Sequence, residues 1–155
     1  MKTIELATVL PAGTAVVWDH VLQPRLLCFV ARGMLTFQPI EPCEFPERWS
    51  AGRFWVRKLL FGLLPIGWQD ISIEFLPDQG RKHRMRENGR GWLIPTWDHT
   101  IEVEPVEGGT RYVDLVKVEA GVLTPIVVTF ARRFFTHRQR RCHKLVEANF
   151  GYATF

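Results

Sequence analysis

The C-terminal part of the chain, from Thr110 onward, constrains the fold more than any other segment. It predicts a strand over Thr110–Glu119, a turn at Ala120-Gly121 and one long helix that begins at Thr124-Pro125. Thr as N-cap with Pro at the first helical position is a typical helix start. At about 100° per residue, one wide apolar face collects Val127, Ala131, Phe134, Phe135, Cys142 and Leu145. Arg138 and Arg141 fall on the same face, so we expect this helix to cover a partly polar interior.

The preceding sequence consists of short periodic segments separated by turn residues. An alternating strand opens the chain around Ile4–Thr8, and Pro11–Thr14 introduces a short helix that Pro24 ends. A second helical turn is expected around Arg25–Phe29, and prolines at 39, 42 and 46 predict an irregular or edge segment. Further strands are predicted at Gly52–Phe61, Trp68–Leu76, Arg81–Asn88 and Trp97–Glu104, with Gly89–Gly91 interrupting the sheet.

The last two strands are predicted to form a hairpin around Gly108-Gly109, because Glu107-Gly-Gly-Thr110 is a two-residue turn signal. That register pairs Val103 with Asp114 and sets His99 opposite Val118, so His99 and Asp114 share a face without being direct neighbours. An antiparallel sheet with its helices on one side is an α+β fold. We therefore predict a single domain over residues 1–155, with a bent sheet around the long helix.

Several classes of protein are disfavoured by composition. Three cysteines, Cys28, Cys43 and Cys142, without close spacing argue against a disulfide framework or a zinc module. The five histidines are poorly spaced as metal ligands, so we expect neither a metal nor a cofactor. We see no signal peptide, and the longest apolar run, Leu59–Trp68, is broken by Gly and Pro. We expect a cytoplasmic protein.

The net charge of +4 is unevenly distributed. Arg81–Arg90 carries +4 and Thr124–Ala148 carries +5, so the remainder is acidic. Such basic runs favour nucleic acid or an anionic membrane as partners. The first run alternates basic residues with His83, Met85 and Glu87, as in a solvated strand face, and no nucleic-acid-binding signature is present. Nucleic acid is thus unlikely, and transient contact with an anionic membrane is the more plausible alternative. Nothing in the sequence predicts the oligomeric state.

Several motifs along the chain resemble the START/Bet v 1-like superfamily, also called SRPBCC or polyketide cyclase/dehydrase-like. They are Pro11-Ala-Gly-Thr with Trp18-Asp-His-Val, Pro46-Glu-Arg-Trp49, Trp97-Asp-His99-Thr-Ile, Gly109-Thr-Arg-Tyr112-Val-Asp114, Ala120-Gly-Val-Leu-Thr124 and Phe134-Phe-Thr-His-Arg138-Gln-Arg-Arg141. The resemblance implies a helix-grip fold in which the curved sheet and the terminal helix enclose a hydrophobic cavity. Members bind lipids, sterols, polyketides or other apolar molecules, and some are cyclases or dehydratases.

Arg138 and Arg141 are the first candidate site residues. Either could anchor a carboxylate or phosphate head group, since guanidinium binds such groups bidentately. The favoured alternative is an ion pair with a sheet carboxylate, Asp114 being the first choice. A third alternative is that both long side chains reach the rim of the cavity.

His99 and Asp114 are the candidate acid and base, although structural roles for both are favoured. Aromatic residues are expected either to line the cavity or simply to fill the core. The predicted ligand-binding set is Phe54, Trp55, Phe75, Trp97, His99, Ile101, Tyr112, Asp114, Phe130, Phe134, Arg138 and Arg141. The leading hypothesis is binding of a hydrophobic or amphipathic small molecule, and the alternative is a cyclase- or dehydratase-type enzyme that uses the same cavity.

Overall fold

A computed structural model describes residues 1–154. Two short helices follow the first strand, six more strands follow the helices, and a long helix closes the chain. The elements are β1 (Lys2–Leu10), α1 (Thr14–Val21), α2 (Pro24–Ala31), β2 (Leu35–Glu41), β3 (Gly52–Leu60), β4 (Leu64–Gln79), β5 (Lys82–Gly91), β6 (Thr96–Val106), β7 (Gly109–Glu119) and α3 (Thr124–Glu147), with 3-10 turns at Gly121–Leu123 and Tyr152–Thr154.

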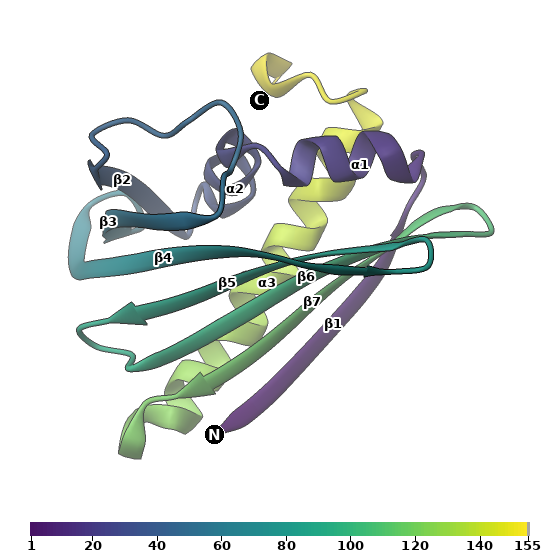
Figure 1. The fold of residues 1–155 in the computed structure, drawn as a ribbon. Coiled ribbons are helices and arrows are strands. Elements are labelled where there is room, and N and C mark those ends of the chain that lie inside the picture. Colours follow the sequence, from purple (N-terminus) through teal and green to yellow (C-terminus); the bar gives the residue numbers. More distant parts are fainter. Residues whose placement is uncertain (155) are drawn as a thin grey trace.

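The seven strands form one antiparallel sheet in the order β1-β7-β6-β5-β4-β3-β2. The sheet curves, and α3 runs obliquely across its inner face, while α1 and α2 cover one end (Figure 1). This arrangement is the helix-grip α+β fold, and it confirms the predicted fold class. The expected edge segment around Pro39 is β2, the last strand of the sheet.

Helix α3 buries the face that its periodicity predicts. All six predicted apolar residues of that face are buried, and Arg138 and Gln139 are buried with them. Thr124 is the first helical residue rather than the N-cap, which is Leu123. The Thr124 hydroxyl instead donates to the carbonyl of Gly121 (2.7 Å) and accepts from the amide of Ala120 (3.0 Å), so it holds the turn that precedes the helix.

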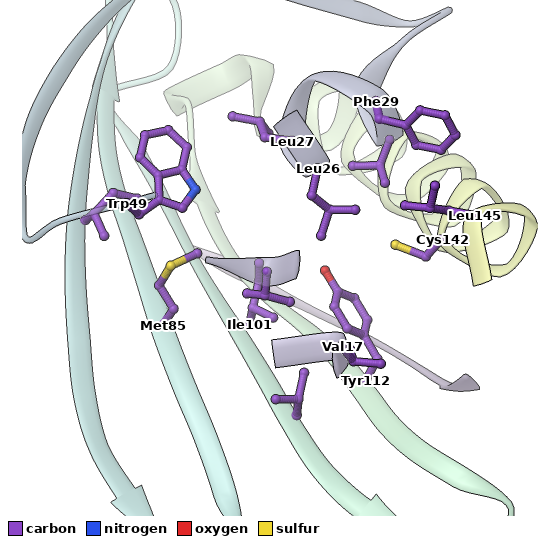
Figure 2. Packing of buried hydrophobic residues seen from close by; sticks show 14 of the residues in the cluster. Val17, Leu26, Leu27, Phe29, Trp49, Met85, Ile101, Tyr112, Cys142 and Leu145 are labelled. Carbon is purple, nitrogen blue, oxygen red and sulfur yellow. The ribbon is translucent and has the colours of Figure 1, made fainter. Parts of the chain in front are cut away.

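The core has two apolar clusters between the sheet and α3. One lies under α1 and α2, where Leu26 and Leu27 meet Cys142 and Leu145 of α3 and Tyr112 of β7 (Figure 2). The other lies toward the opposite end of α3 and includes Val116, Phe134 and Phe135.

The predicted register of the last hairpin is wrong by two residues. Val103 pairs with Tyr112 and Ile101 pairs with Asp114, because the turn is made by Glu107-Gly108 and Gly109 already belongs to β7. A side chain at Gly109 would collide with the carbonyl of Leu10 in β1, so this glycine is needed where the two strands approach. The shift keeps each residue on its predicted face but brings Asp114 next to His99.

The sheet also continues through the predicted break at Gly89–Gly91. Gly89 is buried within β5 and pairs with Ile71 and Trp97 on the neighbouring strands. A Cβ there would clash with the Gln69 side chain, which occupies the space that the glycine leaves. The glycine therefore accommodates a neighbour instead of ending the strand.

Candidate functional site

Six polar residues meet in the interior between the sheet and α3. We call Glu87 of β5, His99 of β6, Tyr112 and Asp114 of β7, and Arg138 and Gln139 of α3 the interior polar cluster. His99 is 1% exposed and Asp114 is fully buried, and buried apolar residues of both core clusters surround them. Burying this much charge is costly unless the groups pair with one another.

His99 links the two carboxylates of the cluster. Its Nε2–H donates to Oδ1 of Asp114 at 2.8 Å, and its Nδ1–H donates to Oε2 of Glu87 at 3.5 Å. Asp114 also accepts from Gln139 Nε2 at 2.9 Å and from the Tyr112 hydroxyl at 3.4 Å. Two carboxylates on one imidazole favour its doubly protonated form.

The pKa values of the cluster follow from this arrangement. Burial opposes the charge on His99, but the hydrogen bonds to Asp114 and Glu87 outweigh it and raise the pKa of the imidazole. Burial likewise opposes ionisation of Asp114 and Glu87, yet the contact with His99 and the charge of Arg138 lower both carboxyl pKa values. The cluster is therefore a buried set of mutually stabilised charges.

Arg138 lies inside the molecule without a direct ion pair. Its guanidinium is 5.0 Å from the ring centre of Phe135 and 5.7 Å from that of Phe134. Among residues 1–154, no carboxylate lies within ion-pair distance of Arg138, and its Nε has no hydrogen-bond partner. The favoured prediction of an ion pair with Asp114 is therefore wrong in its direct form, although Arg138 lowers the pKa of Asp114 through its charge.

Two small cavities flank Arg138. The first, of about 40 Å³, is lined by apolar side chains together with Lys58, Gln69, Glu87 and Arg138. The second, of about 20 Å³, lies under α1 and α2 and is also lined by Glu87 and Arg138. Leu27, Glu87 and Arg138 border both cavities, so these three side chains separate them. Burial lowers the pKa of Lys58, and the negative charge of Glu87 offsets part of this decrease.

Five residues of the predicted ligand-binding set border these cavities. Trp97, Phe130, Phe134 and Arg138 line the first, and Ile101 and Arg138 line the second. Phe54 is buried against Trp49, with ring centres 5.0 Å apart, and belongs to the core. His99, Tyr112 and Asp114 border neither of these two cavities, and the charge of Arg138 acts on the pKa of all three.

Three predicted lining residues lie elsewhere. Trp55 follows the buried Phe54 and so points to the outer face of the sheet, where its ring packs 5.1 Å from Trp68. Phe75 shares a face with Ile73 but lies beyond the covered part of the sheet and is 41% exposed. Arg141 donates from Nε to the carbonyl of Phe29 in α2 at 2.8 Å, so it joins two helices outside the cavities.

Glu87, Lys58 and Gln69 are cavity residues that the sequence prediction missed. Glu87 lies in the basic run, whose alternation predicts a solvated strand face. The strand alternation does contain a signal, since Met85 and Glu87 must point to the same side and Met85 is buried. The charges of Lys82, Arg84 and Arg86 in this run are neutralised by Glu102, Glu74 and Asp98.

A surface hollow lies outside the sheet–helix interior. It measures about 730 Å³ and lies between α2, the β2–β3 connection and the C-terminal segment, with Arg25, Arg32, Phe45 and Tyr152 on its walls. The guanidinium of Arg25 stacks 4.4 Å from the centre of the Tyr152 ring. No helix among residues 1–154 has the length and apolar character to cross a membrane.

Comparison with known proteins places the chain in a family. The family described as "Domain of unknown function (DUF8410)" matches residues 8–146, almost the entire sheet and α3. The chain belongs to the DUF8410 family. No curated protein matches its sequence.

Solved structures share the fold of this DUF8410 member. Protein CV1439 from Chromobacterium violaceum superposes with a TM-score of 0.68 at 17% identity, covering 95% of this chain and 99% of that one. A START superfamily protein from Mycobacterium smegmatis gives a TM-score of 0.67 at 12% identity, and the match covers 94% of this chain and 97% of that one. DynU16, described as a putative protein in the dynemicin biosynthetic locus, gives a TM-score of 0.58 at 13% identity, and the match covers 96% of this chain and 48% of DynU16. The START-like fold is thereby established.

Proposed function

We propose that this DUF8410 protein binds an amphipathic small molecule between the sheet and α3, with an acceptor group of the ligand placed beside Arg138. The observation that carries the proposal is a pair of unsatisfied donors at one cavity. Gln69 Nε2 and Arg138 Nε are both buried, both residues line the first cavity, and neither atom has a hydrogen-bond partner among residues 1–154. A buried donor without an acceptor costs about 1–3 kcal/mol, which a bound carboxylate or carbonyl would recover.

The charges at the cavity favour an anionic group on the ligand. Lys58 and Arg138 face the first cavity against one carboxylate, that of Glu87. The pKa of Lys58 is lowered by burial, so a bound anion would also stabilise its charged form. The rest of the lining is apolar, including Trp97, Phe130 and Phe134, and would hold a hydrocarbon or aromatic body.

The cavities must widen to admit such a ligand. A cavity of about 40 Å³ has room for little more than one water molecule, and the second is smaller. Movement of Leu27 and Arg138, which separate the two, would join them into one larger space. Binding energy would then pay for that rearrangement, so modest affinity is expected for small probes.

Octanoate and octanol form a matched pair of probes for this proposal. Isothermal titration is expected to give tighter binding of the carboxylate to the wild type and loss of that preference in Arg138→Met. Gln69→Leu should weaken octanoate binding without loss of stability, since it replaces an unsatisfied polar group with an apolar one. Arg132→Met, at an exposed position of the same helix, is the control. Equal octanoate affinity in all four proteins would contradict the proposal, and native mass spectrometry would identify any ligand that co-purifies.

A second candidate is acid–base chemistry of the cyclase or dehydratase kind. Its support is Glu87, which lines both cavities and accepts a hydrogen bond from His99. His99 is in turn hydrogen-bonded to Asp114. His99 and Asp114 border neither cavity, so they would position Glu87 and set its charge instead of touching substrate. Glu87→Gln separates the two functions: it should abolish turnover of a cyclisable polyketide probe, whereas a binding protein would keep or increase its affinity for anionic ligands.

A further inference from the structure

Large apolar side chains are exposed at one end of the molecule. The β3–β4, β5–β6 and β7–α3 connections all lie at this end, because successive strands of the sheet are antiparallel (Figure 1). We call residues 61–67, 91–97 and 120–131 the three tips. Leu63 is 85% exposed, Trp92 75% and Ile126 69%, one in each tip. Their exposed neighbours are Phe61, Leu64, Leu93, Val122 and Leu123.

The tips contain no Asp, Glu, Lys or Arg. Each tip has basic residues next to it in the sequence. Arg57 and Lys58 precede the first tip, Arg90 precedes the second, and Arg132 and Arg133 follow the third. The acidic residues that border the tips are Asp70, Asp98 and Glu119. Two of these already face arginines, since Asp70 lies 3.8 Å from Arg53 and Asp98 lies 2.8 Å from Arg86. Arg57, Arg90, Arg132 and Arg133 are exposed and take part in none of the ion pairs found within residues 1–154.

The tips converge on the mouth of the first cavity. The first tip contributes Ile66 to the lining, the second Ile94 and Trp97, and the third Phe130. The Trp92 indole lies over Gly67, where a Cβ would come within 3.8 Å of the ring. The exposed apolar surface is thus built from three segments that pack together, and exposed apolar areas of this kind mark interaction sites.

We propose that the three tips form a docking surface for the lipid bilayer, with the apolar side chains inserted and the arginines at the level of the phosphates. Interfacial segments typically bury their apolar side about 5–10 Å below the headgroups. On α3, seven residues separate Ile126 from Arg133, about 10 Å at the helical rise, so Arg133 reaches the headgroups when Ile126 is inserted. Tryptophans such as Trp92 favour the same interface.

The absence of charge within the tips favours a bilayer over a protein partner. A protein interface ordinarily surrounds its apolar centre with polar groups that pair with the partner. Here every tip residue is apolar or uncharged, and the cations stand behind the tips instead of among them. The inference does not rest on ligand binding, since an empty protein would dock equally well. If both hold, the first cavity opens toward the membrane.

Vesicle flotation tests the docking surface. The wild type should bind vesicles of phosphatidylcholine with phosphatidylglycerol, and bind less to phosphatidylcholine alone. The triple variant Leu63→Ser, Trp92→Ser, Ile126→Ser should bind about 100-fold less, because each change removes a large inserted side chain. The matched control is Val9→Ser, Val16→Ser, Ile40→Ser, which alters three apolar residues of 45%, 47% and 48% exposure outside the tips and should bind as the wild type does.

Each tip substitution is also made alone, and each single variant should lose part of the vesicle binding. Only variants whose thermal unfolding matches that of the wild type are compared. Failure of the wild type to bind either vesicle overturns the inference, as does equal loss in the control. Concentration-dependent self-association of the wild type that the tip substitutions abolish would assign the surface to a second copy and would also overturn it.

Discussion

Asp114→Asn is the most direct test of the interior polar cluster. The substitution keeps the size of a fully buried side chain but removes its charge. In the wild type this carboxylate accepts from His99 at 2.8 Å, Gln139 at 2.9 Å and Tyr112 at 3.4 Å. Removing one member of a buried charged pair typically costs about 3–5 kcal/mol, because the partner is left uncompensated. That is a large part of the roughly 5–15 kcal/mol that holds a domain folded.

The free energy of unfolding is measured by urea denaturation at neutral pH. We expect Asp114→Asn to lower the midpoint with little change in the slope, which reports the surface exposed on unfolding. In a thermal scan the same loss corresponds to a decrease of roughly 6–20 °C for a domain of this size. Asp19→Asn is the control, because Asp19 pairs with Arg48 at 2.6 Å on the exposed surface, and its loss should lie within experimental error.

The dependence of this loss on pH has a definite sign. The pKa of Asp114 is lowered in the folded state, so its contribution is fully present above its ordinary value of 3.8 and is lost as the pH falls through the folded value. The difference between wild type and Asp114→Asn should therefore shrink in acid. A difference below about 1 kcal/mol at neutral pH, or one that does not change with acidification, would refute the argument that Asp114 is a stabilised buried charge.

Two further predictions concern His99 and the cysteines. The pKa of His99 is raised in the folded state, so its contribution to stability is fully present below the ordinary value of 6.5 and is lost as the pH rises through the folded value. The urea midpoint of the wild type should therefore fall as the pH rises above 6.5, and His99→Gln should remove this fall. Burial raises the pKa of Cys142 to about 12, so a thiol reagent should label exposed Cys43 quickly and Cys142 only on unfolding, as mass spectrometry of the labelled protein can show; rapid native labelling of Cys142 would contradict its burial.

The fold was predictable because its elements have clear periods. The buried face of α3 follows from a period of about 3.6 residues, and Arg138 lies on it as predicted. Arg141 does not, since it is on the border of that face, and the position of α2 decides where its side chain goes. Phe54 and Trp55 show a different limit: alternation forbids both from facing the cavity, but only the structure identifies which one points inward.

The site was less predictable because it depends on contacts between distant segments. The sequence is compatible with a turn at Gly108-Gly109 and with one at Glu107-Gly108. The close approach of Leu10 of β1 to Gly109 favours the second. That choice decides whether His99 and Asp114 can bond. Glu87 was hidden within a basic run, because composition averages the two faces of a strand that the sheet separates.

The pairing of β1 with β7 has a consequence for how the chain folds. Leu10 lies opposite Thr110 and Lys2 lies opposite Val118, so β1, the first strand of the sheet to be synthesised, cannot pair until β7, the last of them, has been made. Until β7 emerges, β1 has an unpaired edge and an apolar side with nothing to cover it, and closing so long a loop makes folding slow. The helices α1 and α2 must likewise wait for α3. The sheet is completed only after β7 has been synthesised, which exposes the earlier strands to chaperones or aggregation until then.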